Sequence, residues 1–269
     1  MNNACEIENL LELFKIYSPS KKEHPTVHYI IKKLEEMKVS YKVDFLGNVY
    51  NIFNKDKPVI MAHMDSVPYM KEKSIFKKRN IIIEENIIKS NGFNIGADDK
   101  CGIWICLELL KKYPDINFMF TTEEEIGSNG AKFIEQGNSK YLENINFGLS
   151  FDRKGNRDII FSTTKGNLYS TDDMFCHNIL MASCENGLGF RETKGSFCDC
   201  DIFSGYFNCV NISSGYYNPH TKKEYCNIDD MKKTLSFGEE ILKRLYDKKY
   251  NVDLIKFHEK LVEKIQKGE

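Results

Sequence analysis

Apolar residues along the chain follow two spacings, one typical of helices and one typical of strands. The helical spacing covers residues 4–17 and 24–39, so we expect two amphipathic helices at the start of the chain. Residues 41–53 alternate between apolar and polar side chains around a Gly-Asn turn and predict a β-hairpin. The hairpin leads into an apolar strand that is expected to end at His63.

The rest of the chain alternates predicted strands with predicted helices. A second hairpin is expected over 81–90, and a glycine-containing loop then leads to a helix that starts at Asp98 or Asp99. We expect further strands at 116–121, 145–152, 158–164, 196–203 and 209–213, and further helices at 128–136, 171–186, 227–246 and 253–269, with Thr171 as an N-cap.

This βαβ alternation predicts an α/β fold, a three-layer α/β/α sandwich around a mostly parallel mixed sheet. The sequence has no internal repeat, no low-complexity linker and no break in composition. We therefore expect one catalytic domain over residues 1–269, without an inserted lid or dimerisation domain.

Composition narrows the classes of partner. The formal net charge is -1 and 41% of the residues are hydrophobic, which favours a globular domain with a substantial core. A near-neutral chain has no global field for phosphate backbones or anionic membranes, so nucleic acid and membrane partners are not expected. No stretch resembles a transmembrane segment or a signal peptide, which favours a cytoplasmic protein.

Nine irregularly spaced cysteines favour reduced thiols over a disulfide framework. The densest group is Cys198, Cys200 and Cys209, which leaves a structural zinc site as a minor alternative. Alternation in the expected strand would place Cys198 and Cys200 on one face as small apolar residues, and no fourth ligand is obvious.

Five short segments carry the candidate chemistry: MAHMDSVP, NIGADDKCG, TTEEEIG, LSFDRKG and GYYNPHTKKEY. The first three follow apolar runs, so their polar side chains should meet at strand ends, where open α/β sheets bind ligands. Neutral imidazoles and carboxylates suit zinc, manganese or cobalt, so the pattern predicts a two-metal hydrolase, most simply with two zinc ions. The residues are His63, Asp65, Asp98, Glu124, Glu125, Asp152 and His220.

Roles follow from residue type and position. Asp98, at a helix start after two small residues, is the candidate bridging ligand, and Asp99 is expected to point back into the structure. His63 and His220 can each bind one metal, and the remaining ligands are expected from Asp152 and Glu125.

Two carboxylates are left without a metal. Glu124 beside the metals is the candidate general base, which takes a proton from the attacking water and gives it to the leaving amine. Asp65, two residues after His63, can accept the other N–H of the imidazole and fix its tautomer.

The strings HMDSVP, GADDKCGI and EEIGSNGA resemble motifs of the clan of cocatalytic dizinc peptidases, which includes peptidase T, the glutamate carboxypeptidases, the leucyl-type aminopeptidases and the glutamyl or deblocking aminopeptidases. The resemblance covers residues 18–235. It implies one metal on His63, Asp98 and Asp152, and a second on Asp98, Glu125 and His220, with Glu124 as base and Asp65 as orienting residue.

Spacing separates this chain from the branches that carry an extra domain. Asp152 and His220 are 68 positions apart, and His63 and Asp98 are 35 apart, so neither interval holds the lid or the inserted domain of those relatives. The lid histidine that helps to bind the oxyanion in relatives therefore has no counterpart. Tyr216, Tyr217, His177 and Arg191 are weak candidates for that role.

The resemblance also bears on the substrate. Clan members that act on free N-termini generally have an aspartate at the position of Asp152, which favours an aminopeptidase on small peptides. The alternatives are hydrolysis of a non-peptide amide such as an N-acyl amino acid, and a metal-binding relative without turnover. Arg153 can bind a substrate carboxylate or pair with a structural acid, and a homo-oligomer is left open.

Overall fold

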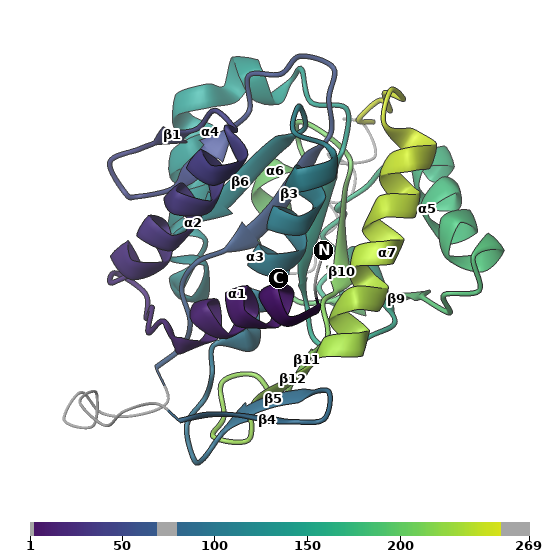
Figure 1. Cartoon of the computed structure of the whole chain (residues 1–269). Helices are drawn as coiled ribbons and strands as arrows, with labels where there is room; N and C mark the ends of the chain where they lie inside the picture. Colours follow the sequence, from purple (N-terminus) through teal and green to yellow (C-terminus); the bar gives the residue numbers. More distant parts are fainter. Residues whose placement is uncertain (1–2, 69–79, 254–269) are drawn as a thin grey trace.

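An eight-stranded sheet forms the centre of the computed structural model, which describes residues 3–68 and 80–253 (Figure 1). Its strand order is β1-β2-β6-β3-β7-β10-β8-β9. The strands are β1 Lys42–Val43, β2 Val49–Asn51, β3 Val59–His63, β6 Asn117–Thr121, β7 Gly148–Arg153, β8 Asp158–Thr163, β9 Arg191–Gly195 and β10 Cys209–Ser213.

The four central strands, β6, β3, β7 and β10, run parallel. Their carboxyl ends therefore lie on one edge, and His63 is in register with Thr121 of the neighbouring strand. The pairs β1–β2, β2–β6 and β8–β10 are antiparallel, so the sheet is mixed. The predicted α/β class with a mostly parallel sheet is confirmed.

Helices cover both faces of this sheet (Figure 1). Strand β3 shows why, because Ile60 and Ala62 pack into one hydrophobic cluster while Val59 and Met61 pack into the other. The first cluster takes side chains from α1 Asn3–Lys15, α2 His24–Met37, α3 Ala97–Lys112, α5 Asp173–Glu185 and α7 Ile228–Leu245. The second takes side chains from α4 Asn129–Leu142 and α6 Cys200–Phe203.

A second, four-stranded antiparallel sheet lies below the large one in Figure 1. Its order is β11-β12-β5-β4, with β11 Tyr216–Tyr217, β12 Tyr225–Asn227, β5 Ile87–Ser90 and β4 Ile81–Glu84. The predicted hairpin over 81–90 thus pairs with a segment more than 120 positions later. Both β11 and β12 contact α3, and the connection between them reaches the start of α3 through Glu224, which accepts the N–H of Gly96.

Three differences between the sequence prediction and the structure lie within residues 171–203. Residues 196–203 form a turn and the short helix α6, not a strand, although Cys198 and Cys200 are both buried as expected. Strand β9 was not predicted, because its largely exposed edge position permits charged residues without an apolar alternation. The N-cap of α5 is Asp172, which accepts the N–H of Phe175, and not Thr171.

The helix predicted over 253–269 lies outside the described residues, apart from its first position. The eight cysteines whose side chains are described carry free thiols. No helix among residues 3–68 and 80–253 is long and apolar enough to cross a membrane.

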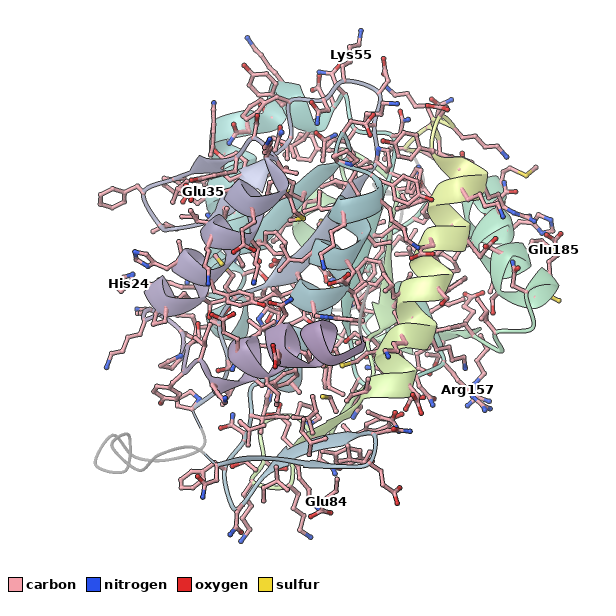
Figure 2. All side chains as sticks on the ribbon, in the orientation of Figure 1. His24, Glu35, Lys55, Glu84, Arg157 and Glu185 are labelled. Carbon is pink, nitrogen blue, oxygen red and sulfur yellow. The ribbon has the colours of Figure 1, made fainter. Side chains whose placement is uncertain are left out.

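Charged side chains extend from the outline of the molecule (Figure 2), among them the labelled Glu35, Lys55, Glu84, Arg157 and Glu185. Basic and acidic residues are nearly equal in number, 38 and 39, which gives the formal net charge of -1.

Candidate dimetal site

Five separate segments bring the candidate residues to the carboxyl edge of the parallel strands. His63 is the last residue of β3, and Asp152 lies near the end of β7. Glu124 and Glu125 open a 3₁₀ turn, Glu124–Ile126, soon after β6. Asp98 lies at the start of α3, and His220 lies between β11 and β12, so all six line or adjoin one cavity.

The first group of possible ligands is His63, Asp98 and Asp152. Nε2 of His63 is 3.1 Å from Oδ1 of Asp98 and 3.5 Å from Oδ1 of Asp152. One donor atom from each of the three residues lies within 4.8 Å of the others. This is the set that the resemblance implies for one metal.

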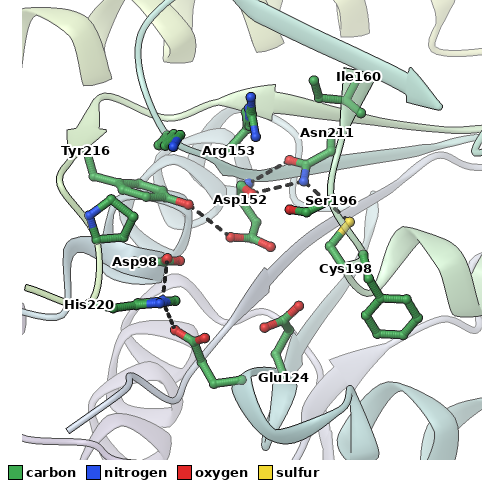
Figure 3. A pocket seen from close by; sticks show the side chains of 15 residues that line it. Asp98, Glu124, Asp152, Arg153, Ile160, Ser196, Cys198, Asn211, Tyr216 and His220 are labelled. Carbon is green, nitrogen blue, oxygen red and sulfur yellow. Dashed lines mark hydrogen bonds and ion pairs between the residues drawn. The ribbon is translucent and has the colours of Figure 1, made fainter. Parts of the chain in front are cut away.

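The second group is Asp98, Glu125 and His220, again with donor atoms within 4.8 Å of one another. Nε2 of His220 is 2.8 Å from Oε1 of Glu125 and 3.2 Å from Oδ2 of Asp98 (Figure 3). Asp98 therefore turns one oxygen to each histidine. A carboxylate in this position can bridge two metal ions.

The backbone around Asp98 departs from helical geometry, with φ -82° and ψ 100°, and the peptide bond to Asp99 is cis. Asp99 is buried and points back into the structure, as predicted. Its carboxylate accepts hydrogen bonds from the N–H of His63 at 3.3 Å and the N–H of Gly102 at 3.0 Å.

The acidic surroundings raise the pKa of both histidines. Hydrogen bonds to Asp98 and Glu125 raise the pKa of His220 to about 10. Burial lowers the pKa of His63, but Asp152 and the neighbouring carboxylates outweigh it and raise that pKa well above the usual value. Burial, opposed by the charge of His63, raises the pKa of Asp152 to about 7. A bound cation would stabilise such a concentration of negative charge.

Glu124 lies across the cavity from Asp152 and points into it (Figure 3). Burial raises the pKa of its carboxyl well above the usual value, and His63 partly offsets this effect. The cavity has a volume of about 200 Å³. Its lining also includes Arg153, Lys154 and the segment from Gly195 to Cys198.

The residues fit two divalent metal ions. The two donor sets contain only imidazole and carboxylate groups, and they share one carboxylate. Their donors come from different elements. Glu124 also lines the cavity but belongs to neither set. Asp99 and Asp65 belong to neither donor set, and their carboxylate oxygens already accept hydrogen bonds from backbone N–H groups.

Asp65 contacts more of the site than the sequence indicated. Nδ1 of His63 lies 3.0 Å from the backbone oxygen of Asp65 and 3.4 Å from its Oδ1. The carboxylate also accepts the N–H of Glu124 at 3.0 Å, the N–H of Glu125 at 3.3 Å and the hydroxyl of Ser20 at 2.7 Å. It therefore connects the β3 end to the turn with the paired glutamates.

Of the four weak candidates for an oxyanion donor, Tyr216 is the one whose side chain lines this cavity. Its hydroxyl lies 3.4 Å from Oδ1 of Asp152. Tyr217 stacks on Tyr225 and donates its hydroxyl to Asp230 instead. His177 and Arg191 are exposed on α5 and β9.

Two further acids are buried near the site, outside the residues to which a role was assigned. Asp199 occupies the N-cap position of α6, yet its side chain makes no cap hydrogen bond and accepts the hydroxyl of Thr121 at 2.5 Å. Glu224 lies in the charged run TKKEY, which is typical of a surface turn. Only 2% of Glu224 is nevertheless exposed. A glutamate four residues after a candidate ligand was the available signal.

A parallel sheet whose strand ends hold two overlapping histidine and carboxylate groups is the architecture of a metal-dependent hydrolase. The chain belongs to peptidase family M20/M25/M40, whose family model matches residues 59–244. Members of this family generally bind two divalent metal ions, and the two donor groups agree with that. The predicted resemblance to the clan of dizinc peptidases is confirmed.

Three known proteins illustrate the similarity. A Pyrococcus furiosus protein with the provisional name LysW-lysine/LysW-ornithine hydrolase is 28% identical over 244 residues, which cover 83% of this chain and 70% of the relative. A Pyrococcus abyssi protein of the same name is 29% identical over 141 residues, 51% of this chain and 38% of the relative. The chain thus spans little more than a third of the latter's length.

The structure of aminopeptidase PepT from Bacillus cereus superposes with a TM-score of 0.73 at 16% identity. The alignment covers 91% of this chain and 99% of the PepT chain. At this identity the similarity supports the fold alone.

Proposed function

We propose that this chain is a two-metal hydrolase that cleaves amide bonds as an aminopeptidase on short peptides. The observation that supports the proposal is the position of Asp98, whose two oxygens lie 3.1 Å and 3.2 Å from the ring nitrogens of two different histidines. A single carboxylate shared in this way is what two cooperating metal sites require.

Each residue has a role in this proposal. His63, Asp98 and Asp152 would hold one ion, and Asp98, Glu125 and His220 the other. When bound, the ions would polarise the scissile carbonyl and lower the pKa of water; the nitrogen and oxygen donors suit zinc, with cobalt or manganese as alternatives.

Glu124 is the proton carrier. It lies in the cavity but in neither donor group, so its carboxylate is available to a water beside Asp98 and Asp152. It takes a proton from the attacking water and returns it to the leaving nitrogen. Its buried setting suits this task, because burial raises the pKa of the carboxyl well above its usual value.

The preference for a free N-terminus rests on the aspartate at position 152, by resemblance, and on a cavity of about 200 Å³ that accepts the end of a short peptide. The test is a panel of aminoacyl-p-nitroanilides, dipeptides and tripeptides, each with a free or an acetylated amine, assayed with zinc, cobalt or manganese. Cleavage of the free amines, abolished by acetylation, would support the proposal. Hydrolysis of the acetylated series alone would overturn the aminopeptidase assignment.

A second candidate is hydrolysis that releases an amino acid from an N-acyl type amide. Two cations, Arg153 and Lys154, line the cavity, whereas its four acidic residues are already assigned to the metals and to Glu124. Such a cavity has positive charge available for a substrate carboxylate. The names of the Pyrococcus relatives point the same way, toward release of lysine or ornithine.

N-acyl-lysine and N-acyl-ornithine, each with a free or an amidated carboxyl group, distinguish this candidate from the first. Faster hydrolysis of the free carboxylates than of the amides is expected. Equal rates for the two forms would exclude recognition of the carboxylate.

A further inference from the structure

Glu224 is a buried carboxylate outside both donor groups, and its hydrogen-bond partners are peptide N–H groups of the loop that carries Asp98. Its Oε2 accepts the N–H of Gly96 at 2.6 Å, and its Oε1 accepts the N–H of Asp98 at 3.5 Å. Only 2% of Glu224 is exposed. The carboxylate therefore lies directly behind the backbone of the candidate bridging ligand.

The carboxylate occupies the place of a helix cap. Helix α3 starts at Ala97 after Gly96, which has a left-handed φ of 64° and no side chain to accept the first N–H groups. A negative charge is favourable at this end of a helix, where N–H groups lack intrahelical partners. Here the cap comes from a residue 128 positions later.

The loop on the Asp98 side is closely packed. A Cβ built at Gly96 would lie 3.2 Å from the side chain of Ser66 and 3.3 Å from Nζ of Lys100. Lys100 itself donates to the backbone oxygens of Ile95 and Ile16. The backbone to which Glu224 bonds is thus held independently by the body of the fold.

The segment on the other side is more exposed. His220 lies between β11 and β12, has a left-handed φ of 62°, and its side chain is 44% exposed. Thr221 bonds within the same turn, to the backbone oxygen of Asn218 and to the N–H of Lys223, and the N–H of Glu224 bonds to the backbone oxygen of Thr221. Glu224 is the buried side chain of this turn and joins it to the Asp98 loop.

We propose that Glu224 is a positioning residue for the second metal site, where it sets the distance between His220 and Asp98 by bonding the turn of one ligand to the backbone of the other. This inference rests on the metal sites of the proposed function. A partner behind a ligand typically changes metal affinity by about 10–100-fold when it is removed.

The experiment is a zinc titration of the metal-free chain against a competing chelator, with the wild type, Glu224→Gln and Glu224→Asp. We expect two zinc-binding steps in the wild type. In Glu224→Gln, the zinc affinity of one step should fall by about 10–100-fold, and that of the other should change by less than about threefold. Glu224→Asp keeps the charge on a shorter side chain and should fall between them. It also carries the test if the glutamine variant does not fold.

Asp172→Asn is the matched control. Asp172 is also a carboxylate that caps a helix, through the N–H of Phe175 at 2.9 Å, but it does not line the cavity. This variant should lower the melting temperature and leave both zinc affinities unchanged. If Glu224→Gln behaves in the same way, its role is structural and the inference is overturned.

A double-mutant cycle tests whether Glu224 acts through His220. In a His220→Ala background, Glu224→Gln should cause little further loss of zinc, because the ligand that it positions is already absent. Additive losses would contradict the proposal. A wild type that binds fewer than two zinc ions would instead overturn the proposed function, so the two failures are distinguishable.

Discussion

Oδ1 of Asp65 accepts the backbone N–H of Glu124 at 3.0 Å, so the residue that faces His63 also holds the turn of the candidate base. Asp65→Asn would replace one acceptor oxygen by an N–H₂ donor, which faces N–H groups of Glu124 and Glu125 that also donate. We expect kcat/KM to fall by about 10–100-fold.

The control is Ser20→Ala, which removes a single donor to the same carboxylate. Its effect on kcat/KM should be smaller than that of Asp65→Asn. Equal effects would mean that Asp65 matters through its link to Ser20 and not through the turn of Glu124.

Glu124→Gln separates proton transfer from metal binding. The amide keeps the shape of the side chain but cannot take a proton, so kcat should fall by about 10²–10⁴-fold with the metal content unchanged. Atomic absorption and steady-state kinetics on the same preparation measure both quantities.

Glu123 provides a neighbouring control for the base. Its carboxylate accepts a hydrogen bond from Asn129 and does not line the cavity. Glu123→Gln should retain most of the activity. A larger loss in Glu123→Gln than in Glu124→Gln would reassign the general base.

Metal loading should release protons. In the metal-free chain hydrogen bonds to Asp98 and Glu125 raise the pKa of His220 to about 10, and carboxylates raise the pKa of His63 against the effect of burial. The imidazole of His220 is therefore protonated at neutral pH, and the raised pKa of His63 favours its protonated form too, while a metal binds the neutral form. Metal affinity should consequently weaken as the pH falls.

Calorimetry in two buffers with different ionisation enthalpies measures this release. We expect the release of more than one proton near pH 7, because the histidines lose theirs and Asp152, whose pKa is raised to about 7, is partly protonated at that pH. His28→Ala, at an exposed histidine on α2, should release the same number as the wild type. A binding enthalpy that does not depend on the buffer would contradict the expectation.

Arg153→Ala tests the second candidate function. Nε of Arg153 donates to Asp158 at 3.1 Å, which holds the guanidinium beside the cavity. Loss of a charged hydrogen-bond donor should raise KM for substrates with a free carboxylate by about 10-fold or more, and leave amidated substrates unchanged.

Arg157→Ala, at an exposed arginine on the outer edge of the molecule, is the matched control (Figure 2). It should change KM for neither form. A similar rise in KM for free and amidated substrates in Arg153→Ala would assign Arg153 to the structure through Asp158.

Local signals in the sequence were sufficient for most of the fold and for the composition of the site. The strand that ends at His63 and the helix that starts beside Asp98 both follow from apolar spacing and from turn residues. The candidate ligands were predicted from five short segments, the first three of which follow apolar runs. The assigned roles remain predictions, as does the single domain.

What the sequence did not indicate depends on pairing between distant segments. Nothing near Glu224 shows that its partner is the backbone of Gly96, because a backbone N–H leaves no mark in the sequence. Strand β9 is recognised through its partner β8 and not by its own charged residues. The alternation around Cys198 predicted a strand, whereas the structure has a turn and a short helix in which Asp199 is buried together with Cys198 and Cys200.

The two outer strands of the large sheet determine how copies of this chain can associate. Strand β1 has only two residues, and β9 exposes Arg191, Glu192 and Lys194. Short or charged edges resist the addition of another strand. Extension of the large sheet from one molecule into another is therefore disfavoured at both of its outer strands.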